Sequence, residues 1–268
     1  MFGVELVKAA RRWRTWMLAA ALGGIPILLV LSLVLSDEAP PPSDDGPPFL
    51  ALILRNGLFA PLAALGVLQV FLLPLTTGLL TGDAVAGEAS LGTLRYLLAR
   101  PVVRHRLVLA KYAAAMVLVA LLVAWVMAVG LAAGGLAYGY GPLPTLSGSS
   151  LGAGAAVLRL LGAGAYVLSG MAALGAIGVF ASTMTDSAPG ATVVTVGLAI
   201  VSQILDSLSA LRAVHPYLVS HHWLAFVDLF RSPIEWSNLR AGVLLHGLYV
   251  VVFLAAAVAW FRRRDVMT

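Results

Sequence analysis

The amino-acid sequence predicts an all-α fold, a polytopic bundle of six transmembrane helices that forms a single domain over residues 1–268. Hydrophobic residues make up 60% of the chain and charged residues only 11%, whereas a soluble domain carries about 25% charged residues. The apolar residues also form continuous runs and do not alternate with polar ones, which favours helices over a membrane β-barrel. Lipid is therefore the expected solvent for much of this chain, and its length suits one bundle.

Six uncharged runs are long enough to predict spans, because a helix needs about 20 apolar residues to cross the hydrocarbon core. They are Met17–Leu35, Leu58–Leu80, Tyr112–Tyr138, Leu160–Ala181, Pro189–Leu205 and Gly242–Phe261. Prolines inside the first two runs predict kinks at Pro26, Pro61 and Pro74. No small-residue cleavage site follows the first run, so we expect a retained span there and not a signal peptide.

The distribution of lysine and arginine predicts the orientation of the bundle. Twelve of the 17 basic residues lie in the amino-terminal segment, in the loop after the second run or at the carboxyl terminus, and the other five flank the opposite ends of the spans. Cytoplasmic loops are the ones enriched in basic residues. We therefore expect a multi-pass protein of the cell membrane with both termini in the cytoplasm. The basic residues form no soluble domain, so nucleic acid is not an expected partner.

Residues 1–16 are predicted to form an amphipathic helix ahead of the first span. Apolar side chains recur there at spacings of three and four, with charged residues on another face. The apolar set is Phe2, Leu6, Ala9, Trp13 and Trp16. A basic amphipathic helix beside a span lies in the membrane surface, so this segment is expected to be interfacial.

The longest external segment, residues 206–241, carries aromatic residues at roughly helical spacing. They are Trp223, Phe226, Phe230 and Trp236. Aromatic rings favour the headgroup level of a membrane. We therefore expect one or two short external helices, at the outer interface, between the fifth and sixth spans.

Histidines in and near this segment raise the question of a metal site. His215, His221 and His222 lie within it, and His246 lies in the last run. His221 and His222 are adjacent, so on a helix they do not face the same way. No aspartate or glutamate lies at a sequence spacing that completes a known set of ligands. The sequence therefore predicts interfacial histidines in this segment and no metal site, and His246 is expected to hydrogen-bond within the bundle.

The most distinctive segment is the cytoplasmic loop over residues 82–106. Thr93 is placed to cap a short helix, because its hydroxyl accepts a hydrogen bond from a free backbone N–H, and Pro101 ends that helix. Leu91, Leu94 and Leu98 then share one face. We expect an amphipathic element that docks into a groove on a soluble partner.

The loop and the carboxyl terminus together resemble a known family. The loop pattern consists of Asp83, Gly87-Glu88, Gly92-Thr93-Leu94, Leu97-Leu98, Arg100-Pro101, Arg104 and Lys111. The carboxyl end reads Phe261-Arg262-Arg263-Arg264-Asp265-Val266. These residues resemble the permease subunits of type 2 ABC exporters. Gly-Thr-Leu alone would be a weak signal, whereas the whole set is fairly specific.

The resemblance implies a division of labour between chains. The loop would contact a separate ATP-binding subunit that holds ATP and Mg²⁺, and the active unit would contain two such subunits and two permeases, identical or paralogous. This chain would be a transport subunit without enzymatic activity or a cofactor, and it contains no G-x-x-x-x-G-K-[ST] phosphate loop.

The residues that the resemblance implicates in coupling lie along the loop. They are Asp83, Glu88, Gly92, Thr93, Leu94, Arg95, Leu98, Arg100, Pro101 and Arg104. Two plainer roles stay open. The arginines could hold the loop to anionic lipid, and the carboxylates could be ordinary solvated groups at the interface.

The expected function is ATP-driven export, or outward flipping, of an apolar or amphipathic substrate. Polar residues within the spans are candidates for its path: Gln69, Thr76, Thr77, Thr195, Ser202 and Gln203. Hydrogen bonding between helices is the commoner role of such residues. The rival hypothesis is an ATP-independent membrane protein, either a secondary transporter or an assembly or anchoring subunit. Secondary transporters commonly carry ionisable residues within their spans, and these runs carry almost none.

Overall fold

The computed structural model describes residues 3, 7, 11–36, 49–90 and 104–263. Within them, five helices are long and apolar enough to cross a membrane, and a bent pair adds a sixth span if its two helices count as one. The long helices are α2 (Trp13–Ser36), α7 (Arg104–Tyr138), α8 (Ala153–Met184), α9 (Ala188–Ser207) and α10 (Trp236–Arg263). The bent pair is α3 (Ala60–Val70) and α4 (Leu72–Gly82). The predicted all-α polytopic bundle is confirmed.

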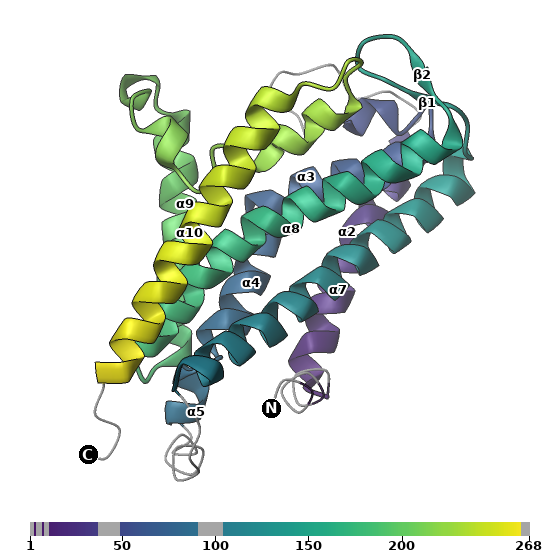
Figure 1. The fold of residues 1–268 in the computed structure, drawn as a ribbon. Helices are drawn as coiled ribbons and strands as arrows, with labels where there is room; N and C mark the ends of the chain where they lie inside the picture. The colour runs from purple at the N-terminus through teal and green to yellow at the C-terminus, as the bar shows by residue number, and fades with distance from the viewer. Residues whose placement is uncertain (1–2, 4–6, 8–10, 37–48, 91–103, 264–268) are drawn as a thin grey trace.

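The two ends of the bundle differ. The start of α2, the end of α10 and the short helix α5 (Ala86–Ser90) lie together at what we call the terminal end (Figure 1). The opposite, distal end carries an antiparallel ribbon in which Leu143 pairs with Leu151. The short elements there are β1 (Leu143–Pro144), β2 (Ser150–Leu151), η1 (Leu50–Leu52), η2 (Gly57–Phe59), η3 (Ser209–Leu211), η4 (His215–Tyr217) and η5 (Trp223–Phe230).

The second predicted span is not one continuous helix. It breaks at Phe71, which takes φ −145° and ψ −51°, and α3 and α4 meet there at 61°. Pro74 explains the break, since proline has no N–H for the Val70 carbonyl four residues earlier and its ring crowds that carbonyl. Pro61, also predicted to kink a helix, stands in the first turn of α3, where no intrahelical donor is needed. Pro26 lies inside the unbroken α2.

Helix α8 lies at the centre of the bundle. Of its most apolar stretch, 67% is buried, against 17% for α10. Its glycines admit neighbouring helices: a Cβ at Gly178 would overlap with Thr81 of α4, and one at Gly175 would meet Met116 of α7. Helices in lipid associate through such small residues, because no hydrophobic force drives them together. The glycine-rich run is therefore a packing surface.

The aromatic residues of the external segment do not all lie at the interface. Three short 3-10 helices are present where one or two short helices were predicted, and Trp223, Phe226 and Phe230 are buried. The predicted interfacial position is wrong for these three and fits Trp236, which is 50% exposed. Helix η5 turns their rings inward, where Phe49 lies 5.3 Å from Phe230 between ring centroids. Burial of such large apolar surfaces outweighs the preference of an aromatic ring for the headgroup layer.

Half of the residues in the amphipathic helix predicted over residues 1–16 lie outside the described residues. Gly3 and Val7 are helical, and a turn and a bend follow at Arg11 and Arg12. Trp13 and Trp16 belong to the first turns of α2. Both side chains are 70% exposed. That exposure at a span end is typical of interfacial aromatic residues.

Candidate functional site

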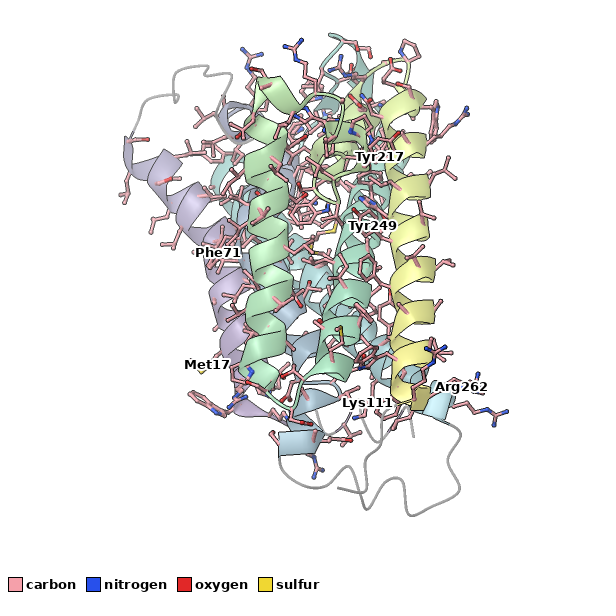
Figure 2. The ribbon with its side chains drawn as sticks, turned by 90° about the vertical axis from the view of Figure 1, so that its left-hand side faces the viewer. Met17, Phe71, Lys111, Tyr217, Tyr249 and Arg262 are labelled. Atoms are coloured by element: carbon pink, nitrogen blue, oxygen red, sulfur yellow. The ribbon has the colours of Figure 1, made fainter. Side chains whose placement is uncertain are left out.

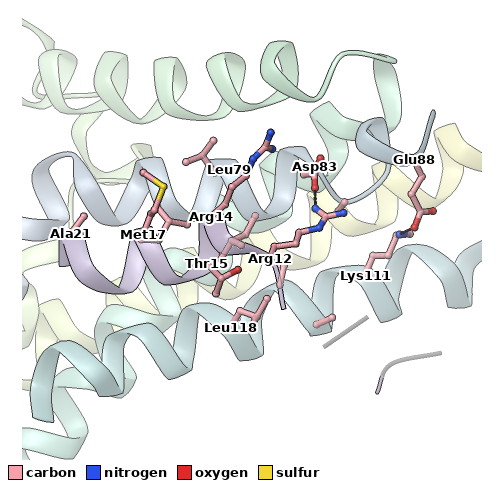
Figure 3. A pocket seen from close by; sticks show the side chains of 15 residues that line it. Arg12, Arg14, Thr15, Met17, Ala21, Leu79, Asp83, Glu88, Lys111 and Leu118 are labelled. Atoms are coloured by element: carbon pink, nitrogen blue, oxygen red, sulfur yellow. Dashed lines mark hydrogen bonds and ion pairs between the residues drawn. The ribbon is translucent and has the colours of Figure 1, made fainter. Parts of the chain in front are cut away.

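A cavity of about 340 Å³ lies between α2, α4 and α7 at the terminal end (Figure 3). Most of its wall is apolar, formed by Met17, Leu18, Ala21, Leu79, Leu80, Ala114, Ala115 and Leu118. Charged side chains gather toward its α5 side: Arg12, Arg14, Asp83, Glu88 and Lys111. The cavity is therefore amphipathic and suits a molecule with an apolar body and a polar head.

A buried ion pair forms part of the charged wall. Lys111 on α7 places Nζ 2.8 Å from Oε1 of Glu88 on α5, and the two side chains are 3% and 7% exposed. In such a site the Coulomb attraction is largely offset by lost hydration, but removal of one partner costs about 3–5 kcal/mol because it leaves an uncompensated charge. The pair therefore holds α5 firmly against α7.

A second ion pair is open to solvent. Arg12, just before α2, donates from Nη1 to Oδ2 of Asp83, just after α4, and the side chains are 40% and 26% exposed. An exposed pair contributes only about 0.2–1 kcal/mol. The start of α2 is thus joined to α4 by a weak contact, beside the strong contact between α5 and α7.

Ser182 of α8 holds the turn that joins α4 to α5. Its Oγ accepts hydrogen bonds from the N–H of Val85 at 3.0 Å and of Ala86 at 2.9 Å, and it donates to the carbonyl of Gly82 at 2.7 Å. Ser182 is fully buried. It supplies partners for backbone groups that the ends of two successive helices leave unsatisfied, and it ties α5 to α8.

An apolar cluster lies beside this turn and joins it to three long helices. Its buried members are Val85, Leu107, Val108, Val179, Ala257 and Phe261. They come from the α4–α5 turn, α7, α8 and α10. Because packed interiors transmit displacement, a movement of α5 would be felt by all three long helices.

Two of the residues predicted for coupling have described side chains, and both lie in this site: Asp83 and Glu88. Arg104 is the first residue of α7. The other seven lie outside the described residues: Gly92, Thr93, Leu94, Arg95, Leu98, Arg100 and Pro101. Contact of this segment with an ATP-binding subunit stays a prediction.

The sequence prediction missed the partners of these carboxylates. Lys111 belongs to the loop pattern, but nothing in its spacing assigns it to Glu88, and Arg12 stands 71 residues before Asp83. One signal was available for Lys111. A lysine directly before an uncharged run becomes buried when the span packs, and a buried lysine is almost always paired. Ser182 gave no signal beyond its place at a span end.

The polar residues predicted for a substrate path lie outside the cavity wall and within helix contacts. They are Gln69, Thr76, Thr77, Thr195, Ser202 and Gln203. Gln69 Nε2 donates to the carbonyl of Trp223 at 3.3 Å, and Ser202 Oγ lies 2.7 Å from Ser220 Oγ. Thr195 donates to the Ala191 carbonyl on its own helix at 2.8 Å. The bonds of Gln69 and Ser202 join different segments and fit the packing role, whereas the Thr195 bond stays within α9. A place along a path stays a prediction.

The bundle defines a polytopic membrane protein, with an amphipathic cavity and the short helix α5 at the terminal end. Residues 1–205 match the model of a family described as ABC-2 family transporter protein. The chain belongs to this family and is a type 2 ABC permease subunit. Membership implies association with an ATP-binding subunit. No curated protein matches the chain. The distal segment after α9, and α10 itself, lie beyond the matched residues.

Proposed function

We propose that this chain forms the membrane pathway of an ATP-driven exporter of apolar or amphipathic molecules, while partner subunits bind ATP and Mg²⁺ and hydrolyse ATP. The observation that carries the proposal is the position of the cavity. Glu88 and Lys111 line it, and the same two residues join α7 to α5, which belongs to the proposed coupling segment, residues 82–106. Movement of that segment therefore acts directly on the cavity wall.

The two ion pairs indicate which helices would move with α5 and which would not. Helix α5 is joined to α7, α8 and α10 by the buried pair, by Ser182 and by the apolar cluster. We therefore expect α7, α8 and α10 to move together when α5 moves. The start of α2 is joined to α4 through the exposed Arg12–Asp83 pair. We infer that closure of the ATP-binding subunits displaces α5 and breaks this weaker pair. The cavity would then open or close between α2 on one side and α4 and α7 on the other.

The charges at the cavity favour a negatively charged head on the substrate. Three basic residues and two acidic ones line it. Arg12 and Lys111 are paired with Asp83 and Glu88, so Arg14 supplies the net positive charge. An anionic amphiphile would place its apolar body along α2, α4 and α7, and its head beside Arg14.

Membership of the family supports, but is coarser than, the subunit arrangement that we propose. Two ATP-binding subunits and a second permease, identical or paralogous, complete the transporter. The terminal end faces the cytoplasm, because the basic residues concentrate beside it. The coupling segment then lies where a soluble ATP-binding subunit can reach it.

The test of coupling uses the assembled complex in lipid vesicles, with ATPase activity and transport measured together. The probe is dansyl-labelled dodecanoic acid, a single-chain anionic amphiphile. Glu88→Gln removes the charge and keeps the shape. We expect transport per ATP hydrolysed to fall about 5- to 150-fold, the range given by a coupling energy of 1–3 kcal/mol.

The matched control is Asp186→Asn, the same change at an exposed carboxylate in the turn between α8 and α9. It should transport like the wild type. If Glu88→Gln transports normally, the coupling assignment is wrong. If the purified chain transports without any ATP-binding subunit, the ATP-driven function is wrong.

A second experiment tests the cavity separately from coupling. Ala115→Trp fills the cavity from α7, whereas Ala124→Trp puts the same ring on an exposed position of that helix. We expect fluorescence titration with the dansyl probe to show weaker binding to the first variant and unchanged binding to the second. Equal binding by both variants would place the substrate elsewhere.

A further inference from the structure

Three side chains converge at the distal end, beyond the residues that the family model matches. Asp206 lies in the last turn of α9, His215 begins η4, and His221 follows in the next turn. Nδ1 of His221 lies 2.6 Å from Oδ1 of Asp206, and Nδ1 of His215 lies 3.7 Å from the same oxygen. One donor atom from each residue lies within 4.8 Å of the other two. The fold thus supplies the carboxylate that sequence spacing did not reveal.

The orientation of His215 is set by its other ring nitrogen. Nε2 lies 3.2 Å from the carbonyl oxygen of Leu208. A carbonyl only accepts hydrogen bonds, so Nε2 carries the proton. In the neutral ring the lone pair of Nδ1 then faces the Asp206 carboxylate, and two acceptors that face each other are stabilised by a cation between them. A metal-binding histidine typically has its second nitrogen held in this way by a backbone carbonyl.

Two of the three donor separations, those from Asp206 to the two histidines, suit a first-row divalent metal. Bonds of about 2.0–2.1 Å from zinc to nitrogen or oxygen place tetrahedral donors about 3.3 Å apart. The His215–Asp206 separation is within about 0.4 Å of this value. The metal would replace the proton between His221 Nδ1 and Asp206, and the imidazole would carry its proton on Nε2 instead. His221 Nδ1 would then move about 0.7 Å away from the Asp206 oxygen to reach the tetrahedral spacing. The three side chains are partly exposed, so water can complete the coordination.

We propose that Asp206, His215 and His221 bind a divalent transition-metal ion of the zinc class. The ion would close the 206–221 segment and join the end of α9 to η4. Tyr217 of η4 in turn accepts a hydrogen bond at its carbonyl oxygen from the hydroxyl of Tyr249 on α10, at 2.8 Å (Figure 2). The metal therefore links α9 to α10 at the distal end, opposite the coupling segment.

Calorimetric titration of the full-length protein in detergent with Zn²⁺, after removal of metals by chelation, tests this site. The wild type should bind one ion per chain. Alanine at Asp206, His215 or His221 should weaken binding by at least about 100-fold, since loss of a mere supporting residue costs 10- to 100-fold. The control is His222→Ala, which removes the adjacent imidazole and none of the three donors, and it should bind as the wild type does.

Thermal unfolding supplies a second readout that does not depend on transport. Zn²⁺ should raise the melting temperature of the wild type and of His222→Ala, and leave the alanine variants unchanged. Melting without metal shows whether each variant is folded, and the isosteric Asp206→Asn serves if Asp206→Ala is not. The proposal is overturned if the wild type binds no zinc, if all variants bind it equally, or if His222→Ala loses binding while His221→Ala keeps it.

Discussion

Gln203 on α9 donates a hydrogen bond from Nε2 to the backbone carbonyl of Val70 at the end of α3, 3.0 Å away. In an unbroken helix that carbonyl would accept from the N–H of residue 74, which is proline. Val70 is 60% exposed on the bundle surface, and lipid offers no water to replace the missing donor. The bend between α3 and α4 and the polar side chain on α9 are thus two parts of one feature.

This relationship predicts that Gln203→Leu destabilises the bundle. The expected loss is about 0.6–1.7 kcal/mol, between the average and the maximum measured for hydrogen bonds between helices in a membrane protein. Equilibrium unfolding in mixed micelles measures it. In a Pro74→Ala background the same substitution should cost less, because alanine restores an N–H for the Val70 carbonyl. An equal cost in both backgrounds would show that Gln203 does not act through that carbonyl.

The sequence predicts the helices well because lipid imposes a simple rule on them. Each uncharged run coincides with a helix or with the bent pair, since a backbone in hydrocarbon must satisfy its own hydrogen bonds. Even the break near Phe71 is implicit in Pro74. No comparable rule governs which side chains meet.

Side-chain contacts between distant segments therefore could not be predicted from the sequence. Glu88 and Lys111 come from different helices, and Asp206 meets His221, which lies 15 residues further along the chain. The inward turn of Phe226 depends likewise on aromatic rings brought by the segment around Phe49. Periodicity assigns a residue to a face, whereas these contacts depend on how whole helices are placed.

Ser182 offers a test of the link between α8 and the α4–α5 turn. Ser182→Ala removes the acceptor for the N–H groups of Val85 and Ala86, both buried. An unsatisfied buried donor costs about 1–3 kcal/mol, so we expect a loss of at least that size in the free energy of unfolding. Ser207→Ala is the control, because its exposed hydroxyl bonds to the Ile204 carbonyl on its own helix. Equal losses in the two variants would contradict a special role for Ser182.

A glycine of α8 and a glycine of α9 predict opposite effects of the same substitution to alanine. Gly178→Ala introduces a Cβ that overlaps with Thr81, and because α4 and α8 are closely packed, overpacking there costs about 1–3 kcal/mol. Gly197→Ala on α9 has open space around the new Cβ, and it should be neutral or stabilise the helix by up to about 1 kcal/mol. Unfolding midpoints of both variants check this pair. A Gly178→Ala protein as stable as the wild type would mean that α4 can withdraw from α8.

The buried pair of Glu88 and Lys111 predicts a distinctive pattern of stabilities. Glu88→Met or Lys111→Met alone leaves a buried charge without its partner, so each should lower the free energy of unfolding by about 3–5 kcal/mol. The double variant removes both charges and fills the space with side chains of similar length. It should be closer to the wild type than either single variant, because replacement of a whole buried pair by apolar groups is often neutral or stabilising.

The same double variant separates stability from coupling. If the pair serves only to hold α5 in place, the double variant should retain transport as well as stability. If the charges must respond to movement of the coupling segment, it should be stable and yet transport poorly per ATP hydrolysed in vesicles. We expect the second outcome, because the pair also lines the cavity. A loss in the double variant equal to the sum of the two single-variant losses would contradict the pairing itself, since the effects of residues in contact are not additive.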